Sequence, residues 1–146
     1  MSEKKSLSKE EYLQSMVAQL EGGKARLETI GKQIRFLESS MSELQATELA
    51  LNSIESARKG TEILVPLGGD SYVKAALADT KAVLVGFGAR ISVETPIGEA
   101  KKTLEHRRGE LDTAMKKLQD SYVDLASKLS ELNASVENLV QEIQGK

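Results

Sequence analysis

The chain has 146 residues, a formal net charge of −2, only 3% aromatic residues and no cysteine. The charge disfavours a general polyanion binder, because non-specific affinity for nucleic acid requires a basic surface, and the lack of cysteine excludes disulfides and thiolate metal sites. No apolar run approaches the roughly 20 residues that span a bilayer, so we expect one cytoplasmic domain over residues 1–146.

A long first helix is predicted over residues 8–58. Ser8 followed by Glu11 is a capping box, in which each side chain accepts a hydrogen bond from a backbone N–H at the start of a helix. Gly60, behind a basic last turn, favours a helix end. Between these signals, ten of twelve seam positions carry apolar side chains, as in a coiled coil. The twelve are Leu13, Met16, Leu20, Gly23, Leu27, Ile30, Ile34, Leu37, Met41, Leu44, Glu48 and Leu51.

Residues 62–94 predict two consecutive β-hairpins. Four short β-leaning runs occur here, and turn sequences rich in Gly, Asp and Thr separate them. The runs are residues 62–67, 72–77, 82–85 and 89–93. Pro66 cannot donate a hydrogen bond to a strand ladder, so we expect it at a sheet edge or at a bulge.

A second long helix is predicted over residues 96–144, with Thr95 as its N-cap and Pro96 as its first helical residue. Six leucines recur along it at seven-residue intervals, which is a coiled-coil seam that needs a partner. They are Leu104, Leu111, Leu118, Leu125, Leu132 and Leu139. Since the first helix supplies a matching seam, the predicted fold is mainly α with a small β portion. It is a long antiparallel coiled-coil hairpin whose two helices are joined by the two β-hairpins.

Folding the two helices back on each other predicts a register. Facing residues then have numbers that sum to roughly 155, which brings Leu51 near Leu104. Each seam has one charged exception, Glu48 in the first helix and Arg108 in the second, and this register places them within about one layer of each other. We predict that they form an ion pair that fixes the register at some cost in stability. The alternative is that both side chains extend from the seam edge into solvent.

No catalytic site emerges from the residue pattern. His106 is the only histidine and lies beside arginines on a helix, as solvated surface histidines do. The glycines around Phe87 lack the spacing of a dinucleotide loop, and Gly68-Gly69-Asp70 lacks the lysine of a phosphate loop. We therefore expect a protein that is not an enzyme and that carries no cofactor and no metal.

Two surfaces remain as candidates for binding. The hairpins offer more apolar side chains than the ends of one helix pair can cover, and uncovered hairpins are marginally stable with edges that invite pairing. We expect oligomerisation through Val65, Leu67, Tyr72, Val73, Leu77, Val83, Val85, Phe87, Ile91 and Val93.

The second surface lies at the open ends of the helices, where Tyr12, Val17 and Val140 are apolar positions beside the seam. A slightly wider helix interface would explain most of them. However, Gly22 and Gly23 fall in the same stretch, and each costs a helix roughly 1 kcal/mol relative to alanine. We interpret this as an interrupted, fraying helix end that can expose apolar side chains to a partner.

The chain resembles the alpha class of prefoldin subunits, on three motifs of the hairpin segment. These are Ile63–Gly69 (ILVPLGG), Ser71–Ala75 (SYVKA) and Val83–Ala89 (VLVGFGA), with Val93 and Glu94 behind them. The likeness extends over nearly the whole chain, although the glycines around Phe87 are shifted relative to the family pattern. Two hairpins, as opposed to one, indicate the alpha class.

The resemblance implies a hexamer of two alpha and four prefoldin beta subunits, assembled through the hairpins. Its coiled-coil tips would capture non-native client proteins and deliver them to a group II chaperonin without ATP, with no role for nucleic acid or membrane. The implied client-binding tip comprises Leu7, Tyr12, Leu13, Met16, Val17, Leu20, Leu132, Val136, Leu139, Val140 and Ile143. Many weak apolar contacts on several arms give avidity without sequence specificity.

Two other classes of protein remain open. A homo-oligomeric or filament-forming structural coiled coil would use the same hairpins without a beta partner. An RNA-binding helical arm, of the kind attached to some synthetases, is more remote because the helices carry no continuous basic stripe.

Overall fold

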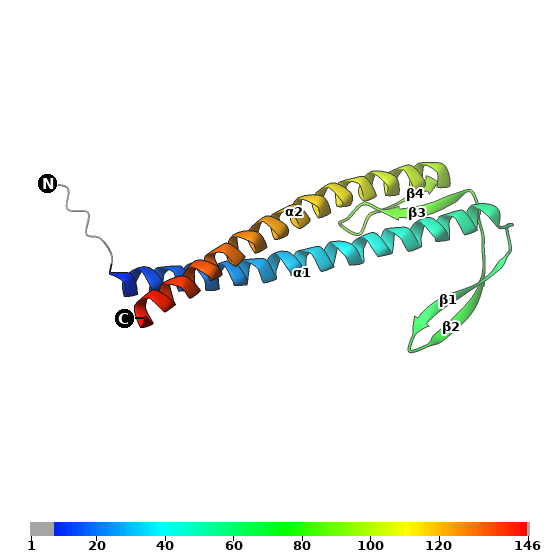
Figure 1. Ribbon diagram of the computed structural model, residues 1–146. Coiled ribbons are helices and arrows are strands. Elements are labelled where there is room, and N and C mark those ends of the chain that lie inside the picture. The colour runs from blue at the N-terminus through cyan, green and yellow to red at the C-terminus, as the bar shows by residue number, and fades with distance from the viewer. Residues whose placement is uncertain (1–7, 146) are drawn as a thin grey trace. The chain divides into compact units, whose positions relative to one another are not determined.

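The computed structural model describes residues 8–145. Along the chain, a long helix is followed by two β-hairpins and then by a second long helix (Figure 1). The elements are α1 (Lys9–Ser56), β1 (Glu62–Gly68), β2 (Ser71–Ala76), β3 (Ala82–Gly86), β4 (Ser92–Pro96) and α2 (Ile97–Gln144). This order confirms the predicted fold class. The chain forms two compact units, one comprising residues 39–112 and the other the described residues on either side of that range. The one-domain organisation stays a prediction.

Helix α1 begins as its sequence predicts and ends slightly earlier. The Glu11 backbone N–H donates to Ser8 Oγ at 3.2 Å, which confirms Ser8 as the N-cap. The helix ends at Ser56, two residues before the predicted end. Thr61 holds the chain that follows, because its hydroxyl donates to the Arg58 carbonyl at 2.6 Å and accepts from the Arg58 N–H at 3.2 Å.

The first hairpin pairs β1 with β2 in antiparallel register, with Val65 opposite Val73. The register shifts between Pro66 and Gly68, so the prediction of a bulge or an edge at Pro66 is confirmed. Gly68 and Gly69 adopt φ values of 99° and 57°, a left-handed backbone that glycine reaches without steric cost.

The second hairpin corrects one predicted strand. Strand β4 begins at Ser92, so the strand predicted over residues 89–93 was placed too early. Strand β3 extends to Gly86, which pairs with Ser92, and the Phe87 N–H donates to the Ile91 carbonyl to close the turn. Ala89 and Arg90 lie inside this turn with φ values of 47° and 62°, which no strand can contain.

The start of α2 also differs from its prediction. Pro96 is the last residue of β4, opposite Ala82, and the helix begins at Ile97. The Thr95 hydroxyl donates to the Val93 carbonyl at 3.0 Å, so this side chain does not cap the helix. The Ile97 N–H donates to the Lys81 carbonyl, and continuation of the hairpin pairing therefore delays the helix by one residue.

The unit of residues 39–112 is built around Leu51, Ala100 and Leu104, which form a buried apolar cluster. The predicted proximity of Leu51 and Leu104 is thereby confirmed. Arg108 Nη1 donates to Glu48 Oε2 at 2.9 Å, which confirms the predicted ion pair. A second pair, between Lys101 Nζ and Glu55 Oε1 at 2.6 Å, joins the same helix segments, so two charge pairs support one register.

The other unit packs the first part of α1 against the last part of α2, and its buried side chains are Met16, Leu20, Ile30, Met115 and Leu129. Helix α1 continues through Gly22 and Gly23, so the predicted interruption is wrong. A Cβ on Gly23 would lie 2.3 Å from Leu129 Cδ2, whereas one on Gly22 would meet nothing within 4 Å. Gly23 is therefore a site of close helix packing, where a side chain does not fit.

Candidate functional site

The β1–β2 hairpin exposes apolar side chains on both of its faces. Leu64 and Val65 are neighbours in β1 and so project to opposite faces of the sheet, yet they are 62% and 38% exposed. Tyr72 and Val73, which are neighbours in β2, are exposed as well. An antiparallel sheet in water normally buries one face. This hairpin is therefore a surface that lacks its cover.

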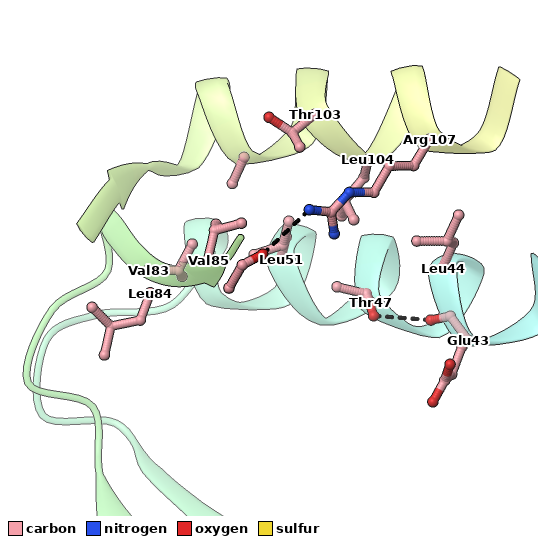
Figure 2. A pocket seen from close by; sticks show the side chains of 12 residues that line it. Glu43, Leu44, Thr47, Leu51, Val83, Leu84, Val85, Thr103, Leu104 and Arg107 are labelled. Atoms are coloured by element: carbon pink, nitrogen blue, oxygen red, sulfur yellow. Dashed lines mark hydrogen bonds between the residues drawn. The ribbon is translucent and has the colours of Figure 1, made fainter. Parts of the chain in front are cut away.

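The β3–β4 hairpin buries one face within its own unit. Val83 and Val85 pack against the Leu51–Ala100–Leu104 cluster, while Leu84 between them is 73% exposed. Figure 2 shows Val83 and Val85 beside Leu51 and the Leu84 side chain turned the other way. Val83 and Val85 thus belong to the core of this subunit, although the sequence predicted them at the oligomer interface. Leu84 is the residue of this strand that is exposed and available to a partner.

The remaining hairpin positions differ in exposure. Phe87, Ile91 and Val93 are 59%, 60% and 47% exposed. Leu77 is half-buried, and its carbonyl accepts from the Gly60 N–H at 2.7 Å. The sequence prediction missed Leu64 and Leu84, although strict alternation along each strand would have identified the opposite face as apolar too.

A cavity of about 320 Å³ is lined by β3 and by the two helix segments of the same unit (Figure 2). Its walls are mostly apolar, with Leu44, Leu51 and Leu104 on the helices. At its rim Arg107 Nη2 donates to the Gly86 carbonyl at 3.3 Å and so ties the end of β3 to α2.

The predicted tip residues differ widely in exposure. Tyr12 and Val17 are 52% and 36% exposed, whereas Met16 and Leu20 are only 5% and 7% exposed. The half-buried members are Leu13, Leu132, Val136, Leu139, Val140 and Ile143. Leu7 lies outside the described residues. Tyr12 and Val17 are therefore the predicted tip side chains most open to a partner in this helix pair.

Most charged side chains at the described helix ends are carboxylates. The helix ends comprise residues 9–21 of α1 and 131–144 of α2. Their charged residues are Lys9, Glu10, Glu11, Glu21, Glu131, Glu137 and Glu142. Lys9 Nζ lies 3.8 Å from Glu142 Oε2, so the only cation of this set is close to one of its anions. The tip thus combines exposed apolar groups with a net negative charge.

The chemistry of an enzyme site was also sought among the described residues. His106 Nε2 lies 2.9 Å from Glu110 Oε1 on the exposed surface of α2, one turn apart. No group of three His, Asp or Glu side chains within residues 8–145 is arranged to hold a metal ion. No helix in that part of the chain is both long enough and apolar enough to cross a membrane.

The chain matches a family model described as prefoldin subunit over residues 23–142. It is 35% identical to prefoldin subunit alpha of Methanocorpusculum labreanum, over 93% of this chain and 90% of that protein. It is also 35% identical to prefoldin subunit alpha of Methanopyrus kandleri, over 82% and 76% of the two chains.

Two solved structures are similar in fold to this chain. A cryo-EM structure of filamentous PFD from Methanocaldococcus jannaschii matches with a TM-score of 0.67 and 26% identity, over 79% of this chain and 95% of that one. The prefoldin beta subunit from Thermococcus strain KS-1 matches with a TM-score of 0.58 at 20% identity, over 87% and 90%, which is a likeness of fold alone.

Proposed function

Because this chain belongs to the prefoldin family and is a chaperone subunit of the alpha type, we propose that it captures non-native proteins at its helix ends. Capture needs no ATP, and the client then passes to a group II chaperonin. The observation that carries this proposal is the match to alpha subunits over most of the chain, together with apolar surfaces at the hairpins and at the helix ends. Both are proposed as binding surfaces.

Assembly with prefoldin beta subunits, as two alpha and four beta, is the first part of the proposal. It is supported by the β1–β2 hairpin, whose Leu64, Val65, Tyr72 and Val73 are exposed in the single chain. Pairing with hairpins of other subunits would cover both faces and both edges. The residues proposed for this interface are Leu64, Val65, Leu67, Tyr72, Val73, Leu84, Phe87, Ile91 and Val93.

Light scattering coupled to size-exclusion chromatography tests the assembly. The chain mixed with a beta subunit should give one species with the mass of the two-to-four hexamer. If the chain alone forms long polymers that a beta subunit does not dissolve, the filament-forming alternative replaces the hexamer. Nothing in the described residues favours the RNA-binding arm over either, and failure to bind RNA at low salt would dispose of it.

Client capture at the helix ends is the second part. Tyr12 and Val17 supply exposed apolar groups, and the buried Met16 and Leu20 would join them when the helix ends separate. Methionine adapts to irregular surfaces, which suits clients without a common sequence. Several arms acting together would turn weak contacts into useful affinity.

A client-aggregation assay with the assembled complex tests this part. Changing both Tyr12 and Val17 to serine should reduce protection, because the exposed apolar area at the helix ends is lost. Leu49→Ser is the matched control, since Leu49 is 65% exposed on α1 and lies outside the proposed tip. Removal of residues 1–20 and 132–146 should have a larger effect, and undiminished protection by either tip variant would refute the assignment. Transfer to a chaperonin requires that both proteins share a compartment, and we propose that this compartment is the cytoplasm.

A further inference from the structure

An open apolar groove of about 640 Å³ lies between α1 and α2 within the unit that contains the helix ends. Its lining shares no residue with the predicted tip or with the hairpins. Its lining is Thr29, Lys32, Gln33, Phe36, Leu37, Ala114, Lys117 and Leu118. Phe36 is 71% exposed, the greatest exposure among the large apolar side chains of the described helices.

The groove follows from helix geometry. Thr29, Lys32, Gln33 and Phe36 stand three, four and seven residues apart, so they form one face of α1. The facing α2 segment presents Ala114 where the coiled-coil pattern would accept a larger side chain. Its small volume leaves room between the helices beside Phe36. The seam leucines Leu37 and Leu118 are half-buried and form part of the groove wall, and Phe36 extends the groove beyond the seam.

The charge of the groove is one-sided. Lys32 and Lys117 line it and no carboxylate does, although the whole chain has 22 acidic and 20 basic residues. Lys32 Nζ is 3.7 Å from Glu28 Oε1, but both side chains are about 70% exposed and such a pair contributes little. No ion-pair partner of Lys117 is found among residues 8–145. Both ammonium groups can therefore turn to a ligand.

We propose that this groove docks an amphipathic helical segment of a partner protein that carries carboxylates beside its apolar row. One or two apolar side chains of the partner would cover Phe36 and fill the space above Ala114, in the manner of a helix bound in a groove. Asp or Glu side chains one turn away would reach Lys32 and Lys117. The charge complementarity selects acidic segments over basic ones and adds to the rate of association.

This specificity is opposite to that of the tip. Carboxylates predominate at the described helix ends, so an acidic segment is repelled there and attracted at the groove. A partner of this kind can occupy the groove while a client occupies the helix ends. The inference is independent of client capture, and the two can be tested separately.

The test uses the full chain and two fluorescently labelled helical peptides of about 18 residues, or five turns. Both carry the same leucine row, flanked in one peptide by glutamate and in the other by lysine. At low salt we expect the glutamate peptide to bind about tenfold more tightly than the lysine peptide by fluorescence anisotropy. A photo-crosslinker on the leucine row should label residues 29–37 and 114–118.

Two pairs of variants identify the site. Phe36→Ser should weaken the glutamate peptide about tenfold or more, while Val123→Ser, at a 67% exposed position of α2 outside the groove, should leave it unchanged. Changing both Lys32 and Lys117 to glutamine should abolish the preference for the glutamate peptide. Changing Lys24 and Lys102 to glutamine gives a chain with the same net charge as that double variant, and it should preserve the preference for the glutamate peptide.

The proposal is overturned by equal binding of the two peptides, by binding that Phe36→Ser does not weaken, or by crosslinks at the tip or the hairpins. Far-UV circular dichroism of each variant excludes loss of the helices as the cause. Because tip variants such as Tyr12→Ser leave the groove intact, failure of client capture and failure of groove binding give different results. A lysine peptide that binds more tightly would also refute the assignment, since it would place the site among carboxylates.

Discussion

Two adjacent glycines of α1 should respond in opposite ways to the same substitution. At Gly22 an added Cβ meets nothing within 4 Å, and an alanine there should stabilise the helix by about 1 kcal/mol. At Gly23 the Cβ would lie 2.3 Å from Leu129 Cδ2 and 3.3 Å from Leu129 Cγ. No pair of non-bonded carbon atoms tolerates the shorter of these distances, so Leu129 or the helix must move.

The magnitude follows from two terms. Gly23→Ala gains the same helix propensity as Gly22→Ala, about 1 kcal/mol, and pays for overpacking, which typically costs about 1–3 kcal/mol. The net change at Gly23 is therefore between zero and about 2 kcal/mol of destabilisation. Because the propensity term is common to both variants, it cancels in their difference. Gly22→Ala should exceed Gly23→Ala in stability by about 1–3 kcal/mol.

Urea unfolding of the isolated chain, followed by far-UV circular dichroism, measures this difference. Leu129 is 9% exposed, so it cannot simply swing into solvent from its present position. Leu129→Ala should remove the clash, and in that background Gly23→Ala should become less harmful by about 1 kcal/mol or more. Equal stability of the two single variants, or no coupling with Leu129, would show that the helices do not approach closely at Gly23.

Three further predictions follow from the unit of residues 39–112. A double-mutant cycle on Glu48 and Arg108, whose side chains are 23% and 45% exposed, should give a coupling below about 1 kcal/mol in unfolding, and molar salt should remove most of it. Changing Leu64 and Leu84 to serine should shift the complex with a beta subunit to smaller species by light scattering, with an unchanged helix signal; an intact complex would exclude them from the interface. Ala89→Gly should raise the unfolding midpoint, since φ is 47° there and relief of the left-handed strain is worth about 1 kcal/mol; a lower midpoint would contradict the turn geometry.

The sequence could predict the helices because their signals are local. A leucine repeat, the Ser8 cap and the length of each helix need no knowledge of the rest of the molecule, and the pairing of Glu48 with Arg108 follows from the register. The turn at Ala89 and Arg90 could not be predicted in this way. Neither residue type favours a left-handed backbone, and the pairing of Gly86 with Ser92 imposes it.

The candidate surfaces were predicted less completely than the fold, because exposure depends on which face of a strand packs on the helices. Val83, Leu84 and Val85 are all apolar. Leu84 is exposed only because Val83 and Val85 are the two that pack against the cluster containing Leu51. The same applies to Met16 and Leu20, which belong to the predicted tip and are buried in the helix pair. Apolar type alone could not separate these residues from Tyr12 and Val17.

The two uncovered faces of β1–β2 have a consequence for how such a subunit is made. A newly synthesised chain presents Leu64 on one face and Val65 on the other, and its strand edges are open to any other extended chain. Its supply in a cell therefore has to match the supply of whatever covers the hairpin. Surplus copies should be found in insoluble material or be degraded, so the stoichiometry of synthesis becomes part of the stability of this protein.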